Sequence, residues 1–298
     1  MGQHKHKAPR ICLFCGKRGD MSKEHVFSKW ISKYLPDPAL NHKVTSSDDS
    51  WLPEHMRRTP LNKTVAGATG SRTFKIVCRT CNNGWMSDME QLIEPLLARG
   101  FEGGKIDLDV DQQSLLARWI EKTAMVRDEG SSMMPVSTDE QRRALMKSIG
   151  ADPLTKVYLG TFQDAKGPLR WRHHPHSGGY RDDNGPDVRQ DSVVIGPWIF
   201  HVFSSHLPEA IERFGVKLDN CTGDFLKQIW PIVDPIVHWP VKAMNYRQYF
   251  FMAELSRWEI GIRVANKLDS DVVLMTSEQW CTVSPTEVMR RLPYVGLV

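Results

Sequence analysis

Hydrophobic and polar positions follow different patterns in different parts of the chain. Residues 44–72 are polar and irregular, which predicts a long loop with room for one short helix. Phe74–Val77 alternate between apolar and polar side chains and favour a strand. Residues 82–99 predict a helix that Gly100 is expected to end. Its apolar face is expected to contain Met89, Leu92, Ile93 and Leu96.

Two further helices are predicted in the middle of the chain. Residues 111–128 have an amphipathic pattern, and Gly130 is expected to mark its end. The buried positions are predicted to be Leu116, Trp119, Ile120, Thr123 and Val126. Thr138 and Gln141 have the spacing of a capping box, in which each side chain binds the other residue's backbone N–H. A helix is therefore expected to begin there and to stop at Gly150.

Beyond residue 150 the period of the pattern changes to two, which predicts strands. The alternating stretches are residues 156–163, 193–203, 249–254, 258–264 and 272–275. Residues 164–191 are rich in Gly, Pro, His and Asp and favour an exposed loop. Ser284-Pro285 predicts the start of a last short helix. Helices followed by strands predict an α+β fold with a mostly antiparallel sheet.

The chain is expected to contain two units. Its 298 residues suit one large domain or two small ones, and the boundary is predicted within residues 100–110. We expect a cysteine-bearing domain at residues 8–105. Residues 106–298 would form an α+β domain whose role, in binding substrate, binding a partner or regulation, stays open.

Composition excludes several classes of protein. The chain is 41% hydrophobic and 25% charged, which excludes disordered, collagen-like and coiled-coil proteins. No stretch approaches the roughly 18 apolar residues of a membrane span, and residues 1–7 lack the apolar core of a secretory signal. A cytoplasmic protein without a membrane partner is therefore expected. The net charge of +4 permits a phosphate-rich partner without requiring one.

Four of the six cysteines form two Cys-x-x-Cys pairs: Cys12, Cys15, Cys78 and Cys81. Such pairs predict a tetrahedral structural zinc site, in which each pair supplies half of the thiolates. Gly16 suits a turn that needs positive φ. The intervening residues 16–77 far exceed the roughly 12–20 of a self-contained zinc ribbon. Zinc would therefore staple a larger insertion, or the pairs are unrelated. Cys221 and Cys281 are interpreted as small buried hydrophobic residues.

Polar residues suited to hydrolysis lie next to these pairs. A four-thiolate zinc ion is closed and is not itself a catalyst, but it would bring Glu24 and His25 close to Asn82. Carboxylate and amide oxygens suit Mg²⁺ or Mn²⁺. An imidazole with a pKa of about 6.5 can accept a proton from water. The alternatives are a solvated Glu-His pair and an asparagine that caps its helix.

The order Cys12-x-x-Cys15, Glu24-His25 and Cys78-x-x-Cys81-Asn82 resembles the zinc-stapled branch of the HNH endonucleases. The run CNNGWMSDME, which begins at Cys81, is similar to a CN-x-GW run in a bacterial and phage subgroup of that family. The resemblance covers about residues 10–95. It implies an N-terminal ββα-metal unit, in which a β-hairpin and a helix surround one divalent ion.

The resemblance also implies roles for individual residues. His25 would be the general base that activates water, and Glu24 and Asn82 would bind the catalytic Mg²⁺ or Mn²⁺. Glu90 lies two helical turns beyond Asn82 and is expected to support the site or to bind the ion through water. The alternative for Glu90 is an ordinary surface or helix-pairing carboxylate.

The chain departs from the family pattern at two positions. Thr73 stands where the family's middle Asn is expected, and Met86, at the position of a third ligand, is a poor ligand for Mg²⁺. Trp85 is interpreted as a core residue rather than a base-stacking platform. The cluster His173-His174-Pro175-His176 resembles a metal site but is interpreted as part of a solvated loop.

The predicted partner is nucleic acid, with DNA favoured. Basic residues that could contact phosphates are Lys17, Arg18, Lys23, Lys29, Lys33, Arg57, Arg58, Lys63, Arg72 and Lys75. The main hypothesis is a metal-dependent endonuclease with structural zinc, active in defence against foreign DNA or in phage or mobile-element biology. The alternatives are a zinc-stapled nucleic-acid-binding module without catalytic activity and a structural or assembly protein. A protein partner or oligomer stays open.

Overall fold

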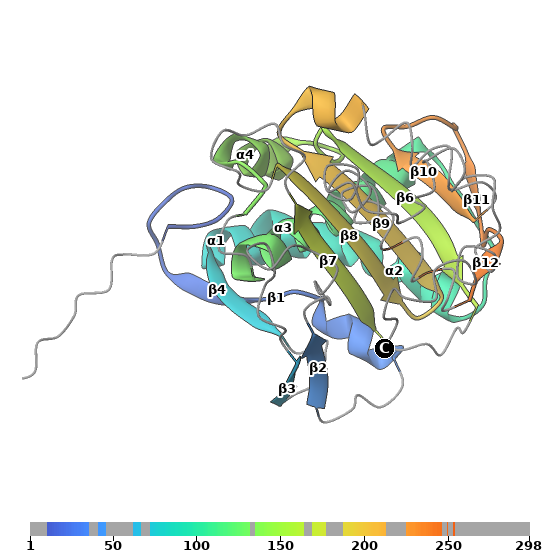
Figure 1. Ribbon diagram of the computed structural model, residues 1–298, viewed down its shortest axis with the longest axis horizontal. Coiled ribbons are helices and arrows are strands. Elements are labelled where there is room, and N and C mark those ends of the chain that lie inside the picture. Colours follow the sequence, from blue (N-terminus) through green and yellow to red (C-terminus); the bar gives the residue numbers. More distant parts are fainter. Residues whose placement is uncertain are drawn as a thin grey trace, which may run out of the picture.

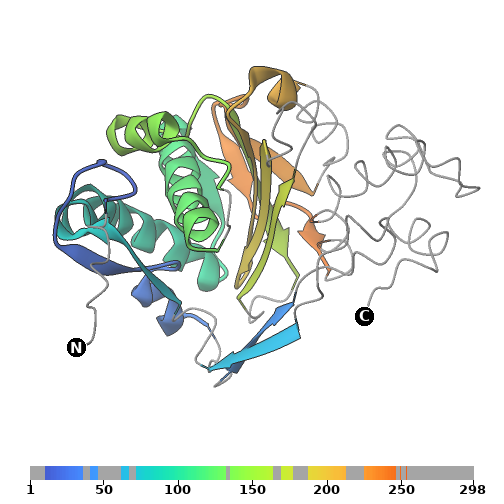
Figure 2. The same ribbon diagram turned by 60° about the vertical axis from the view of Figure 1, so that its left-hand side comes forward.

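The computed structural model describes residues 11–35, 41–45, 62–66, 72–131, 135–163, 169–176, 187–212 and 225–245, together with Tyr249 and Ala253. Helices and sheets are both present, which confirms the predicted α+β class. Figure 1 shows a large sheet with helices α2 and α3 behind it. After a turn of 60°, Figure 2 shows the helices between this sheet and the N-terminal strands.

The N-terminal part contains two antiparallel strands followed by a helix. Strand β1 (Met21–His25) pairs with β4 (Thr73–Cys78), which confirms the strand predicted at Phe74–Val77. The chain continues through α1 (Arg79–Cys81) and a π-helical turn, η4 (Asn82–Met86), into α2 (Ser87–Phe101). A short 3₁₀ helix, η1 (Lys29–Lys33), follows β1. The identity of this arrangement with a ββα-metal unit stays a prediction.

The end of α2 differs from the prediction. Gly100 lies inside the helix, and the left-handed backbone occurs at Gly103, with φ at 80°. Glycine is needed at position 100 because an added Cβ would overlap the Trp198 ring. The buried face also differs, since Leu92 is 62% exposed and Leu97 is fully buried in its place.

Helices α3 (Val110–Ser131) and α4 (Asp139–Lys147) confirm the two helices predicted in the middle of the chain. All five positions predicted to be buried in α3 are buried. The capping box is also present: the Gln141 N–H donates to Thr138 Oγ1 at 3.2 Å, and the Thr138 N–H donates to Gln141 Oε1 at 3.0 Å. Helix α4 ends before Gly150, which instead packs against the Trp230 ring.

The large sheet is antiparallel except at one edge pair. Its strands are, in spatial order, β10 (Leu226–Trp230), β6 (Thr155–Phe162), β9 (Trp198–Ser205), β8 (Val188–Ile195) and β7 (Arg170–His176). The short β12 (Ala243–Met244) pairs parallel with β6. Two small sheets are separate: β5 (Ile106–Leu108) with β11 (Val237–Trp239), and β2 (Asn41–Thr45) with β3 (Asn62–Ala66).

Three predictions for these strands were wrong. The stretch 193–203 is not one strand, because Gly196, with φ at 57°, turns the chain between β8 and β9. The stretch 164–191 is not only a loop, since it contains β7 and the start of β8. Strand β3 lies within the stretch 44–72 that was predicted to be irregular.

Several predictions concern the C-terminal part of the chain. Tyr249 and Ala253 have helical backbone, which contradicts a strand at residues 249–254. The Tyr249 N–H donates to the Asn245 carbonyl at 3.0 Å. The other predictions lie outside the described residues; they concern residues 258–264, 272–275, Cys221, Cys281 and the helix from Ser284.

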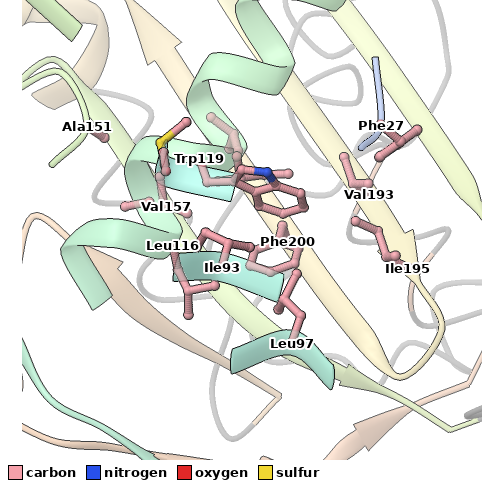
Figure 3. Packing of buried hydrophobic residues seen from close by; sticks show 14 of the residues in the cluster. Phe27, Ile93, Leu97, Leu116, Trp119, Ala151, Val157, Val193, Ile195 and Phe200 are labelled. Atoms are coloured by element: carbon pink, nitrogen blue, oxygen red, sulfur yellow. The ribbon is translucent and has the colours of Figure 1, made fainter. Parts of the chain in front are cut away.

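One hydrophobic core joins the N-terminal part to the sheet. Figure 3 shows Leu116 and Trp119 of α3 and Ile93 of α2 beside Phe200 of β9. The rings of Trp119 and Phe200 are 5.8 Å apart in an edge-to-face contact. This core contains residues from both sides of position 105. The division into two domains stays a prediction, and the packing is continuous across it. None of the described helices combines the length and apolarity that crossing a bilayer requires.

Candidate metal centre and adjoining pocket

The four paired cysteines gather at one point. They come from the turn before β1 and from the junction of β4 with α1, and their sulfur atoms all lie within 4.8 Å of one another. They are Cys12, Cys15, Cys78 and Cys81, all as free thiols. Gly16 has φ at 69°, which confirms the predicted turn, and its N–H donates to the Cys12 carbonyl at 3.0 Å. The two pairs are therefore related.

The geometry of this cluster suits a tetrahedral ion. Sulfur ligands about 2.3 Å from zinc lie about 3.8 Å apart at the corners of a tetrahedron. The Sγ atoms of Cys15 and Cys78 are 3.8 Å apart. The Cys78 N–H also donates to Cys12 Sγ at 3.3 Å, which favours a thiolate there. The four residues could hold a metal ion such as zinc.

A pocket of about 570 Å³ lies beside β1 and α2. Its lining includes every residue predicted to take part in catalysis: Glu24, His25, Asn82 and Glu90. The lysines Lys23, Lys29 and Lys33 also line it. Pairing of β1 with β4 explains this arrangement, because it places residues 24 and 25 next to the strand that leads into Asn82.

Glu24 and Glu90 share a buried ammonium group that sequence reasoning missed. Lys122 of α3 is fully buried, and its Nζ lies 3.4 Å from Glu24 Oε1 and 3.0 Å from Glu90 Oε1. Burial alone would lower the pKa of Lys122, but the two carboxylates outweigh this effect and raise it. Lys122 is therefore charged. Burial raises the pKa of Glu24, an effect that Lys122 opposes.

A signal for Lys122 is present in the sequence. Trp119 and Val126 lie three residues before it and four residues after it, so this lysine falls on a face of the helix whose neighbours are apolar. A lysine at such a position is rarely fully buried unless it is paired. The pattern indicates a buried partner but not which carboxylates supply it.

His25 lies in the pocket at the end of β1. Burial and the nearby charge of Lys29 lower its pKa, and Glu90 opposes them. His25 is therefore neutral at neutral pH, with a ring nitrogen able to accept a proton. Thr73 is the antiparallel partner of His25 in β4, so the residue at the family's Asn position lies on the strand opposite the histidine.

The side chain of Asn82 is held by β1. Its Nδ2 donates to Ser22 Oγ at 3.0 Å, and Ser22 Oγ donates to the Val77 carbonyl at 3.2 Å. With the amide nitrogen used in this way, Oδ1 is the atom available to a ligand. Met86, at the expected position of a third ligand, is buried and contributes to the core.

From the sequence, Trp85 was interpreted as a core residue and His173 as part of a solvated loop. The Trp85 ring packs edge to face on Phe14 at 5.1 Å and lies beneath the Arg118 guanidinium, as expected of a core residue. The interpretation of His173 as part of a solvated loop was wrong. His173 is on β7, with Nδ1 2.7 Å from Asp191 and Nε2 3.5 Å from Asp128. Because the described strand places it between two buried carboxylates, His173 is an internal ion-pair residue.

The predicted basic residues are dispersed. Lys23, Lys29 and Lys33 lie at the pocket, whereas Arg72 lies over the Phe74 ring at 5.0 Å. Arg57 and Arg58 lie outside the described residues. The local positive charge at the pocket therefore comes from three lysines of β1 and η1, partly offset by the ion pair between Lys33 and Glu94 at 2.8 Å.

Among the described residues, the cysteines are the one group of three or more Cys, His, Asp or Glu side chains gathered closely enough for a metal ion. A cation in the pocket would therefore rest on few protein ligands, which is common for Mg²⁺ because it keeps several waters. No protein-family model, curated protein or solved structure matches the chain. The chemistry of the pocket is therefore the basis for assigning a function.

Proposed function

We propose that the protein is a metal-dependent endonuclease that hydrolyses phosphodiester bonds, with DNA as the favoured substrate. The observation that carries the proposal is one pocket lined by a neutral histidine, an asparagine, two carboxylates and three lysines. The adjacent thiol cluster supports it, since structural zinc would fix β1 against the junction of β4 and α1.

Each pocket residue has a role in this proposal. His25 accepts a proton from the attacking water, and the β1–β4 pairing fixes the backbone that carries the imidazole. Glu24 and Asn82 supply oxygen ligands for one Mg²⁺ or Mn²⁺, which neutralises charge on the scissile phosphate and its leaving oxygen. Lys23 and Lys29 attract the phosphate backbone. Glu90 orients Lys122 through their ion pair.

The proposal is tested by nicking of supercoiled plasmid with Mg²⁺ or Mn²⁺. His25→Ala is expected to reduce the rate by at least about a hundredfold, the ordinary contribution of general acid–base catalysis. His238→Ala is a matched control, because His238 is exposed and pairs with Asp107 on the small β5–β11 sheet. If His25→Ala cuts as fast as the wild type, the assignment of the base is wrong.

A binding module without catalytic activity is the competing function. The three lysines at the pocket support it as well as they support a nuclease. It predicts that the wild type retards DNA in a gel at low salt but never nicks it with any divalent ion. A chain that neither binds nor cuts would support a structural or assembly role.

A further inference from the structure

Lys122 of α3 does not line the predicted catalytic pocket itself, but it contacts two carboxylates that do. It contacts one oxygen of each of these carboxylates, and both of those residues, Glu24 and Glu90, line the pocket. The three groups carry one positive and two negative charges, so the trio retains a net charge of −1. A divalent ion that binds Glu24 is therefore attracted by less charge than two free carboxylates would provide.

The Lys122 ammonium lies between two carboxylates, as a bound metal ion does, and it is buried, unlike a lysine in an ordinary surface ion pair. Its side chain is 1% exposed, so its charge is poorly screened by water. It also contacts one oxygen of each carboxylate, Oε1 in both cases, which is how a cation bridges two acidic ligands. In two-metal hydrolytic sites a second divalent ion performs this bridging.

We infer that Lys122 is a resident cation that takes the place of a second divalent ion, so that the pocket binds one divalent cation with moderate affinity. This inference rests on the proposed function for the identity of the pocket. Lys122 contacts neither water nor phosphate in this role. It is a positioning residue that acts through Glu24 and Glu90.

The experiment measures Mn²⁺ binding to the zinc-loaded full chain by electron paramagnetic resonance and calorimetry. The wild type is expected to bind one Mn²⁺ in the pocket. Lys122→Met removes the ammonium at similar volume and leaves two unneutralised carboxylates. Mn²⁺ is then expected to bind at least about tenfold more tightly or to occupy two sites. A lysine with only a structural role would weaken binding or leave it unchanged.

Glu90→Gln tests the same idea in the opposite direction. The trio then has no net charge, and Mn²⁺ affinity is expected to fall at least about tenfold. The double variant Lys122→Met/Glu90→Gln restores a net charge of −1 and is expected to bind one Mn²⁺ about as tightly as the wild type. If Glu90 were itself a ligand, the double variant would stay weak, which would overturn the inference.

Arg142→Met is the matched control. Arg142 also joins two carboxylates, Glu129 at 3.0 Å and Asp139 at 2.9 Å, but it does not line the pocket. Its removal is expected to leave Mn²⁺ affinity unchanged. Equal affinity and stoichiometry in the wild type and Lys122→Met would refute the inference. If Lys122→Met does not fold, the Mn²⁺ affinities of Glu90→Gln and of the double variant decide the question. A Glu90→Gln protein that binds Mn²⁺ as tightly as the wild type would then count against the inference.

The inference and the nuclease proposal can fail separately. If Mn²⁺ affinity shifts as expected but no variant nicks DNA, the resident cation stands and the nuclease proposal is wrong. If the wild type nicks DNA while Lys122→Met binds Mn²⁺ like the wild type, the nuclease proposal stands and the resident cation is wrong.

Discussion

His173 is charged inside the protein because two carboxylates surround it. Burial opposes the charge, but Asp191 and Asp128 raise the pKa of His173 to about 9. The hydrogen bond from His173 and the charge of Arg189 likewise lower the pKa of Asp128 to about 2, against the effect of burial. The Arg189 Nε lies 3.0 Å from Asp191 Oδ2, so the cluster holds two cations and two anions.

This cluster makes stability depend on pH. The pKa of His173 is higher in the folded chain than the ordinary value of 6.5, so its stabilisation is complete below about pH 6.5. It is expected to be lost as the pH rises through about 9. The measurement is the free energy of unfolding in urea, for the wild type and His173→Gln, between pH 6 and pH 10.

The relevant quantity is the difference in the free energy of unfolding between the wild type and His173→Gln, because other groups titrate in both proteins. It is expected to be largest near pH 6, to shrink as the pH rises above about 6.5, and to be lost above about pH 9. A difference that stays constant over this range would show that His173 is not charged in the folded protein.

The thiol cluster connects two secondary-structure elements far apart in the sequence. Cys12 is in a turn whose Leu13 N–H donates to the Ile76 carbonyl of β4 at 2.9 Å, and Cys81 ends α1. We expect one zinc per chain by elemental analysis and expect Cys78→Ser to lose it, with a lower melting temperature, because structural zinc sites contribute folding energy.

Cys221→Ser and Cys281→Ser are the controls for that measurement, since these cysteines lie outside the pairs. Both are expected to keep the zinc. Full zinc content in Cys78→Ser would exclude a four-thiolate site.

The contact between α2 and β9 depends on the absence of a side chain at Gly100. The Trp198 ring occupies the space of a Cβ, and its Nε1 donates to the Leu97 carbonyl at 3.1 Å. Gly100→Ala is expected to destabilise the fold by about 1–3 kcal/mol through overpacking, despite the better helix propensity of Ala. Chemical denaturation checks this, with Gln91→Ala on the exposed face as the control. A more stable Gly100→Ala protein would contradict the packing.

The sequence predicted those elements that local patterns determine. The capping box, the buried face of α3 and the strand before Cys78 depend on neighbouring residues, and all three were correct. The predictions were wrong where contacts between residues far apart in the sequence determine the structure. Gly100 has the local signature of a helix stop, yet it lies inside the helix. A glycine is required there because the Trp198 ring leaves no room for a side chain.

The candidate pocket shows the same limit. The two cysteine pairs indicated that Glu24, His25 and Asn82 would be neighbours, and the structure brings all three to one pocket together with Glu90. Lys122 was missed because its partners Glu24 and Glu90 lie 98 and 32 residues away in the sequence and on other elements. The helical pattern indicates that position 122 is buried, but it does not indicate which carboxylates pair with Lys122.

At the scale of the whole molecule, the N-terminal part depends on later residues for its packing. The Phe74 ring of β4 fills the space of a Cβ at Gly130 of α3, and Lys122 neutralises Glu24. A fragment of residues 1–105 would expose this surface and leave a buried carboxylate unpaired.

Such a fragment, even with zinc, is therefore expected to unfold without the sharp cooperative transition of the full chain. Thermal unfolding followed by circular dichroism, with limited proteolysis, checks this. A fragment as cooperative and protease-resistant as the full chain would instead support an independent domain at residues 8–105.

The placement of Lys122 also has a consequence for how the protein is made. Chains are synthesised from the N-terminus, and N-terminal regions begin to fold first. During translation Glu24, His25, Asn82 and Glu90 emerge before α3 does, so Glu24 and Glu90 have no ammonium partner until Lys122 has left the ribosome. The proposed DNA-cutting activity, if it needs Lys122 to position Glu24 and Glu90, is expected to be absent from nascent and prematurely terminated chains and to begin only once α3 has folded against β1 and α2.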